Sequence, residues 1–511
     1  MTEKQERVEG HPFKLRKDLI QPEALQLVPE TMARKYRVMP MEIKKGNVLR
    51  VAMANSADIL AIEALETLTR MRIESQAASA EEVQETIDFS YQSYEKIKEQ
   101  MDSISLPGET ETTIEEIASD TVADAPIAKA LTVIIDGAIK ARASDIHIQP
   151  EEDNLRVRYR IDGTLHDTLS LPVATSIPII SRLKILAKMN IADRQRPQDG
   201  QLSVKPKDRQ EMDVRVATIP IVHGEMAALR LLDKSKALMT LAQLGFLPGT
   251  MAKYEEMLKV PYGMILATGP TGAGKTTTLY ASLNTLDRKG RNIITIEDPV
   301  EYRFKNINQI QVNTKAGLTF ASGLRSILRL DPDVLLIGEM RDAETAGIAV
   351  QAALTGHLVL STIHANDAIG VVARLLDLGI DPFLVASALI GVVAQRMGRR
   401  TCRECAQMVE VSPLEQAAYS KEVGEERSEF LCGSGCKTCA NTGYQGRIGF
   451  YEILSISDEI RTMLMKGADA TELRTQAIKE GMIPLIKDGM LKVKENITTP
   501  AEVLRNAYSV D

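Results

Sequence analysis

A glycine-rich segment near the middle of the 511-residue chain carries the clearest chemical signal. Residues 269–276, Gly-Pro-Thr-Gly-Ala-Gly-Lys-Thr, match the pattern G-x-x-x-x-G-K-[ST] of a phosphate-binding loop. Its glycines let backbone N–H groups turn toward a phosphate, and the helix that follows directs the positive end of its dipole to the same anion. In such a loop Lys275 contacts the β and γ phosphates and Thr276 holds Mg²⁺. The residues expected to contact the nucleotide are Gly269, Pro270, Thr271, Gly272, Ala273, Gly274, Lys275, Thr276 and Thr277.

Acidic residues follow two apolar segments, at the position where a phosphate-loop enzyme has its active acids. The segment Val334–Ile337 leads through one glycine to Glu339, as in a Walker B element, so Glu339 is predicted to accompany Mg²⁺ and the attacking water. Another apolar segment ends in Glu297, our first choice for the base that orients this water. For Asp298 and Glu301, which follow closely, a capping role remains open.

Histidine and arginine residues surround the same region. His357 and His364 lie at the start and just past the end of a predicted strand, too far apart to share a metal ion. We expect His364 to sense the γ-phosphate and His357 to be structural. Arg325 and Arg329 are four residues apart and are predicted to share one helical face, which either faces solvent or supplies charge to the phosphates.

Four of the five cysteines form two C-x-x-C pairs separated by thirty residues. This spacing is typical of a tetrahedral zinc site, and four protein ligands leave no open position for catalysis. A structural Zn²⁺ site is therefore predicted, with four unlinked thiols as the alternative and Cys432 outside the set. The predicted ligands are Cys402, Cys405, Cys436 and Cys439.

The elements that would position these residues alternate between strand and helix after Pro248, which is typical of a parallel sheet. In a parallel sheet the strands end at one edge, so the phosphate loop and the acids would lie together there. The predicted strands are Met264–Ala267, Asn292–Glu297, Val334–Ile337 and Leu358–Thr362.

An α+β domain is predicted before this core. Leu155–Ile161 and Thr164–Leu169 alternate polar and apolar residues around Asp162-Gly163, a strong hairpin signal. Helices are expected at 127–142 and 176–190, a strand at 145–149, a turn at Pro197–Gly200, and strands near 201–205, 211–219 and 227–232.

A smaller α/β domain is predicted at the beginning of the chain, with a helix at 29–36, strands at 38–43 and 48–53, and a helix at 58–68. From residue 96 to residue 124 the sequence becomes acidic and loses large apolar residues, which indicates a flexible linker.

Composition limits the classes of function. Apolar residues make up 44% of the chain and charged residues 26%, as in ordinary globular proteins. The polar N-terminus lacks the apolar core of a secretory signal, and no apolar run approaches the ~20 residues of a membrane span, so neither feature is expected. The net charge of −7 and the absence of Trp argue against a nucleic-acid track.

Taken together, these motifs resemble the secretion ATPase family, which includes type II secretion motors and type IV pilus assembly motors. Residues 269–280 resemble its Walker A, 294–301 its Asp box, 330–342 its Walker B and 355–367 its His box. Residues 143–148, 197–200 and 216–232 resemble its second N-terminal domain, and the segments 442–447 and 486–489 are also similar.

The resemblance implies a multidomain α/β protein with a RecA-like core. It also implies the residues matching the family's catalytic arginines: Arg215, Arg230, Arg325 and Arg329. The domains expected are a partner-docking domain (1–95), the linker (96–124), a PAS-like α+β domain (125–235), the ATPase core (236–400), a zinc-binding segment (401–455) and a helical segment (456–511).

The resemblance further implies a cytoplasmic homohexamer that uses ATP, Mg²⁺ and Zn²⁺. It would associate peripherally with the inner membrane through a platform protein and other components, and act indirectly on pilin or pseudopilin. Retraction motors of the family are typically shorter and lack the cysteine tetrad, which favours extension or secretion. Residues 15–19 offer only part of the cyclic-dinucleotide motif of some relatives, so that ligand is not predicted.

Two other functions remain as alternatives: a DNA-handling ring NTPase, and a scaffold whose nucleotide site regulates assembly. The first would need a basic strand-binding track with aromatic residues. The second conflicts with the complete set of Lys275, Glu297 and Glu339, which favours turnover.

Overall fold

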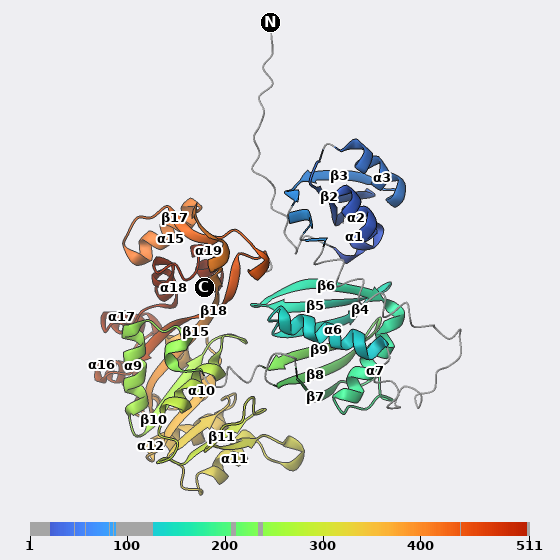
Figure 1. Cartoon of the computed structure of the whole chain (residues 1–511). Helices are drawn as coiled ribbons and strands as arrows, with labels where there is room; N and C mark the ends of the chain where they lie inside the picture. Colours follow the sequence, from blue (N-terminus) through green and yellow to red (C-terminus); the bar gives the residue numbers. More distant parts are fainter. Residues whose placement is uncertain are drawn as a thin grey trace. The chain divides into compact units, whose positions relative to one another are not determined.

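The computed structural model describes residues 21–44, 46–56, 58–80, 82–84, 86–87, 126–205, 211–232, 239–439 and 441–507. The linker predicted at 96–124 and the partial motif at 15–19 lie outside these residues. The chain divides into two compact units, one of residues 1–232 with 435–442 and the other of 233–434 with 443–511 (Figure 1).

The beginning of the first unit is a small α/β domain. Its three strands pair in the order β1-β2-β3, antiparallel between β1 and β2 and parallel between β2 and β3. The side chain of Asp58 accepts a hydrogen bond from the N–H of Ala61 and so caps α3. Four elements lie close to those predicted: α2 (Glu30–Tyr36), β1 (Val38–Lys44), β2 (Val48–Met53) and α3 (Ile59–Thr69). Helix α1 (Pro22–Leu27) and strand β3 (Arg72–Ala77) were not predicted.

The rest of the first unit is a six-stranded antiparallel sheet packed against two helices, in the order β6-β5-β4-β9-β8-β7. The predicted hairpin is confirmed, since Ile161 pairs with Thr164 and both turn residues between them have positive φ. The elements are α6 (Pro126–Lys140), β4 (Asp145–Pro150), β5 (Asn154–Ile161), β6 (Thr164–Pro172), α7 (Ser176–Leu186), β7 (Gln198–Val204), β8 (Met212–Ile221) and β9 (Gly224–Leu232).

The prediction of a turn at Pro197–Gly200 is wrong, because Gln198, Asp199 and Gly200 are the first residues of β7. Pairing with β8 begins at Gln198, which lies opposite Thr218. Glycine is needed at position 200 for close packing and not for a turn, because a Cβ on Gly200 would lie 2.4 Å from the carbonyl oxygen of Ala187.

The core of the second unit is a seven-stranded sheet in the order β12-β11-β13-β14-β10-β15-β18. Every neighbouring pair is parallel except β15 and β18, which are antiparallel. Four strands lie where the sequence predicts them, and β12, β15 and β18 were not predicted. The strands are β10 (Gly263–Thr268), β11 (Ile293–Glu297), β12 (Asn308–Gln311), β13 (Val334–Ile337), β14 (Leu358–Ile363), β15 (Leu389–Thr401) and β18 (Tyr444–Ser455).

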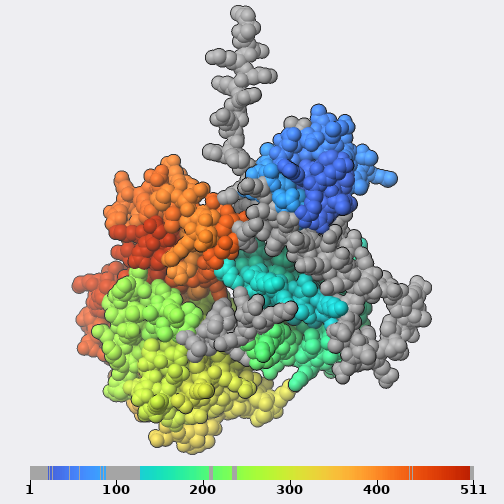
Figure 2. All heavy atoms as spheres, viewed as in Figure 1, coloured from blue at the N-terminus to red at the C-terminus, as the bar shows by residue number. Residues whose placement is uncertain are grey.

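Helices from distant parts of the sequence pack on this sheet. Lys253 of α9 donates hydrogen bonds to the carbonyl oxygens of Glu480 and Gly481. Figure 1 shows the green α9 beside the red C-terminal helices, and green and red atoms adjoin in Figure 2. The helices near the sheet are α8 (Leu241–Leu244), α9 (Pro248–Lys259), α10 (Lys275–Thr285), α11 (Phe320–Ile327), α12 (Ala343–Leu354), α13 (Ala368–Asp377) and α14 (Pro382–Ala388).

The last part of the chain adds a two-stranded antiparallel ribbon and further helices. β18 lies within the segment assigned to zinc binding, yet it is an edge strand of the core sheet. The ribbon is β16 (Ala406–Glu410) with β17 (Glu429–Gly433), and the helices are α15 (Pro413–Val423), α16 (Asp458–Met465), α17 (Ala470–Lys479), α18 (Leu485–Lys494) and α19 (Pro500–Ala507). Within the described ranges, every helix is too short or too polar to cross a bilayer.

Candidate nucleotide and metal sites

The glycine-rich loop joins the fully buried strand β10 to helix α10, as its pattern predicts. Gly269, Gly272 and Gly274 have φ values of 143°, 78° and 87°, which residues other than glycine rarely adopt. The Lys275 ammonium donates to the carbonyl oxygens of Gly269 at 2.6 Å and Pro270 at 3.1 Å. The lysine therefore folds back over the loop that would hold a phosphate.

Strand β15 supports the loop from the side opposite β14. The side-chain amide of Gln395 donates to the carbonyl oxygen of Ala273 at 2.5 Å. A Cβ at Gly269 would lie 2.3 Å from the carbonyl oxygen of Gln395. Sequence reasoning missed this contact, because no motif marks a residue 122 positions away in the chain.

Glu339 lies just beyond the end of β13 and faces Arg341 and His364. Its carboxylate pairs with Arg341 at 2.6 Å, and the Nε2 atom of His364 lies 3.9 Å from its other oxygen. Burial lowers the pKa of Lys275, and the negative charge of Glu339 partly opposes this shift. Glu339 therefore interacts electrostatically with Lys275 and lies close to His364.

Glu297 is the last residue of β11, and its side chain is only 3% exposed. Its carboxylate accepts hydrogen bonds from the Thr295 hydroxyl at 2.6 Å and the Gln309 amide at 3.1 Å, and a third from the Tyr280 hydroxyl. Parallel pairing of Ile296 with Ile337 sets the ends of β11 and β13 next to each other.

Gly338, which stands where many phosphate-loop enzymes have aspartate, lies against the strand that carries Glu297. A Cβ on Gly338 would come within 3.3 Å of the Glu297 Cα atom, so a larger residue would press on β11. Both predicted acids therefore lie at the ends of neighbouring strands, where Glu297 accepts three hydrogen bonds and Glu339 pairs with Arg341.

The segment that follows β14 and begins with His364 is fixed by residues of strands β10 and β15. Ala365 exchanges two 2.9 Å hydrogen bonds with the side chain of Thr268, the residue before the phosphate loop. Arg396 donates to the carbonyl oxygen of Asn366 at 2.5 Å. His364 itself is 57% exposed, so its imidazole remains accessible to a ligand.

Two residues from the C-terminal part of the chain complete this attachment. Arg474 of α17 pairs with Asp367 at 2.6 Å, and buried Glu452 of β18 accepts a hydrogen bond from the N–H of Ala368 at 2.9 Å. Burial raises the pKa of Glu452. His357, by contrast, contacts the carbonyl oxygen of Ala352 at 2.9 Å, which fits the structural role expected for it.

Arg325 and Arg329 do not share a helix face, so that prediction is wrong. Helix α11 ends at Ile327, and Arg329 lies in the turn before Asp331-Pro332, where Asp331 has a φ of 51°. Arg329 still contacts its neighbour, donating to the Arg325 carbonyl oxygen at 2.9 Å. Arg325 pairs with Glu344 of α12, and its side chain is 54% exposed.

Arg215 and Arg230 lie in the other compact unit, directly opposite each other on β8 and β9. Arg230 is 59% exposed and pairs with Asp145 at 3.1 Å. Asp145 also lies 3.7 Å from Arg160. These arginines form a cationic stripe on one sheet of the first unit.

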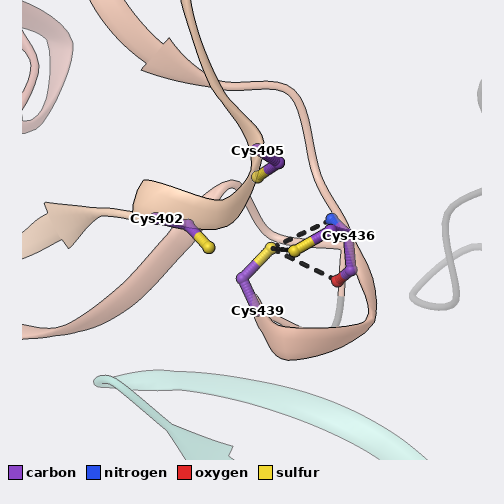
Figure 3. Close-up of side chains that lie close together, drawn as sticks. All are labelled: Cys402, Cys405, Cys436 and Cys439. Carbon is purple, nitrogen blue, oxygen red and sulfur yellow. Dashed lines mark hydrogen bonds between the residues drawn. The ribbon is translucent and has the colours of Figure 1, made fainter.

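The four predicted cysteine ligands form one cluster, and their sulfur atoms all lie within 4.8 Å of one another (Figure 3). The sulfur atoms of Cys436 and Cys439 are 3.7 Å apart. Tetrahedral zinc with Zn–S bonds of about 2.3 Å requires sulfur separations of about 3.8 Å, so this pair fits the ion. Cys432 is not in the cluster.

The loop bearing Cys436 and Cys439 is fixed at both ends next to the other pair. The N–H of Ser434 donates to the carbonyl oxygen of Cys405 at 2.9 Å, and the N–H of Cys402 donates to that of Gly443 at 3.0 Å. Close approach here requires glycine, because a Cβ on Gly433 would lie 1.9 Å from the Gly443 carbonyl oxygen.

Comparison with known proteins finds family matches for two segments of the chain. Residues 120–505 match the type II/IV secretion system protein family, and residues 10–95 match the MshEN domain. The type IV pilus assembly ATPase PilB of Myxococcus xanthus is 43% identical over 495 residues, covering 95% of this chain and 87% of that protein.

A second curated relative and a solved structure agree with this match. The type II secretion system protein HxcR of Pseudomonas aeruginosa is 45% identical over 386 residues, covering 76% of this chain and 78% of that protein. The pilus retraction motor PilT with bound ADP is 26% identical with a TM-score of 0.50, covering 74% of this chain and 96% of that one. The chain therefore belongs to the type II/IV secretion system protein family and is an ATPase of the secretion and pilus-assembly class.

Proposed function

We propose that the chain is a hexameric motor that hydrolyses ATP to drive assembly of pilin or pseudopilin fibres through an inner-membrane platform protein. The observation that carries this proposal is the phosphate loop with Lys275 folded over it and Glu339 and His364 beside it. The relatives named for pilus assembly and for type II secretion support the coupling to fibre assembly.

In this proposal Lys275 and the loop N–H groups would bind the phosphates, and Thr276 and Glu339 would hold Mg²⁺. Both residues offer oxygen atoms, the donor type that Mg²⁺ prefers. The bound ion would neutralise charge that develops on the phosphates. Glu297 acts as the base that orients water, and His364 contacts the γ-phosphate.

Arginines complete the proposed catalytic set. Arg215 and Arg230 are proposed to supply charge to the phosphates late in the reaction, and Arg325 and Arg329 to add charge from the core. Their late arrival would stabilise the transition state more than the bound substrate.

The four-cysteine cluster is proposed to hold one structural Zn²⁺. Four thiolates occupy all four coordination positions of a tetrahedral zinc ion, so this site contributes stability and takes no part in hydrolysis. The ion would join the ends of two segments thirty residues apart.

Residues 1–95 are proposed to be the docking module that places a cytoplasmic motor peripherally at the inner membrane through its partners. The phosphate loop and its acids all lie outside this domain. A chain lacking residues 1–95 should still hydrolyse ATP and should leave the membrane fraction. Retention of the shortened chain on membranes would move the docking surface to another part of the protein.

The function is tested in cells that lack the native gene. Wild-type protein should restore surface fibres or secreted protein, whereas Lys275→Ala at equal abundance should restore neither. A DNA-handling enzyme would instead show ATPase activity stimulated by single-stranded DNA, so that stimulation together with normal fibres in the Lys275→Ala strain would reject the proposal.

A further inference from the structure

The carboxylate of Glu297 is held in one orientation by donors on three elements. Oε1 accepts from Thr295 of β11 and Gln309 of β12, and Oε2 accepts from the hydroxyl of Tyr280 on α10. Two of these donors converge on one oxygen, and among the residues that the structure describes Tyr280 is the donor to the other. The orientation of the carboxylate thus depends on the tyrosine.

Tyr280 belongs to the helix that begins at the phosphate loop. It follows Thr276 by four residues, about one helical turn, so both side chains lie on the same side of α10. A movement of this helix with the loop would therefore be transmitted to Glu297 through a single hydrogen bond.

The ring of Tyr280 is fixed independently of its hydroxyl. It is 2% exposed and packs edge-on against Phe304 and Tyr302, with ring centroids 4.8 Å and 6.1 Å away. Burial, followed by the charge of Glu297, raises the pKa of Tyr280, so the phenol keeps its proton and remains a donor. Loss of the hydroxyl alone should leave the ring where it is.

We propose that Tyr280 is a positioning residue that fixes the Glu297 carboxylate relative to the phosphate loop. This inference rests on the proposed role of Glu297 as the base that orients water. A base must be held close to its productive orientation, and a misplacement of about 1 Å can cost roughly 10²-fold in rate. Tyr280 thereby couples the position of α10 to the water-orienting step.

The chain offers a matched control on helix α9, where a buried tyrosine contacts the same helix α10. Tyr254 is also fully buried, and its hydroxyl lies 2.7 Å from the hydroxyl of Ser282 on α10. Tyr254→Phe therefore removes a buried phenol hydroxyl bonded to this helix without removing a donor to Glu297.

The experiment compares Tyr280→Phe, Tyr254→Phe and Glu297→Gln in the full chain, measuring nucleotide affinity, kcat and the thermal midpoint. Tyr280→Phe should lower kcat by about 10-fold to 10²-fold with affinity and midpoint close to those of Tyr254→Phe. In a double-mutant cycle, Tyr280→Phe should cost little once Glu297→Gln is present, because it acts through that carboxylate.

Two results would overturn the inference. One is a kcat for Tyr280→Phe equal to that of Tyr254→Phe while Glu297→Gln is inactive. The other is a loss of activity in Tyr280→Phe that comes with loss of nucleotide affinity or with unfolding. Failure of the proposed function looks different, because Glu297→Gln would then turn over ATP normally whatever Tyr280→Phe does.

Discussion

Single residues decide whether a metal ion is held, and the four clustered thiols make this testable. Cys436→Ser replaces a soft thiolate with a hydroxyl that zinc binds poorly, whereas Cys432 lies outside the cluster. We expect metal analysis of the purified proteins to find one zinc per chain in wild type and Cys432→Ser, and less in Cys436→Ser. Zinc retained at the same level in both variants would contradict the ligand assignment.

The residues that can be predicted from the sequence are those that local spacing identifies. Lys275 and Glu339 follow from a loop pattern and a short buried strand, and the cysteines from two paired spacings. Tyr280 and Gln395 could not be predicted, because their roles depend on hydrogen bonds to Glu297 and to Ala273. Such contacts depend on how the sheet brings distant strands together.

At the scale of elements, a buried ion pair attaches helix α18 to strand β18. Asp488 and Lys492 are 2.5 Å apart and at most 1% exposed, and they bond to the N–H of Tyr451 and the carbonyl oxygen of Gly449. Burial raises the pKa of Asp488 and lowers that of Lys492. Each of these buried charges is therefore tolerated only because the other serves as its counterion.

Asp488→Asn would leave the Lys492 charge buried without its counterion. We expect this change to lower the free energy of unfolding by about 3 kcal/mol, measured by urea denaturation. The control is Lys494→Ala on the same helix, because its partner Glu425 is 54% exposed and the urea midpoint should not move. Equal midpoints for the two variants would contradict a stabilising role for the pair.

The errors in predicting elements have physical causes. The composition of Gln198–Gly200 is typical of a turn, but these residues pair with β8 and so form the beginning of a strand. Strand β15 contains Gly391 and Gly398, which fit close approaches to Met257 and Phe450. Tertiary contacts of this kind override local preference, whereas the hairpin at Asp162-Gly163 was predictable from its turn residues.

At the scale of the whole molecule, the proposal divides the catalytic set between two compact units. Arg230→Ala should leave nucleotide affinity and the thermal midpoint nearly unchanged and lower kcat by at least about 10²-fold, because the charge would act in the transition state. Arg156→Ala is the control, since Arg156 pairs with Asp167 and Glu151 on the same sheet. If Arg230 were instead structural, Arg230→Ala would lower the thermal midpoint, and if Arg230 had no role, neither kcat nor the midpoint would change.

The central claim is that ATP is hydrolysed at the loop that carries Lys275. Steady-state phosphate release from the purified full chain tests it most directly, with wild type compared to Lys275→Ala and to the isosteric Glu339→Gln. We expect turnover by wild type and a loss of about 10²-fold or more in each variant, because phosphate contacts or placement of the metal and water are lost. Turnover near the wild-type rate in Lys275→Ala would contradict it.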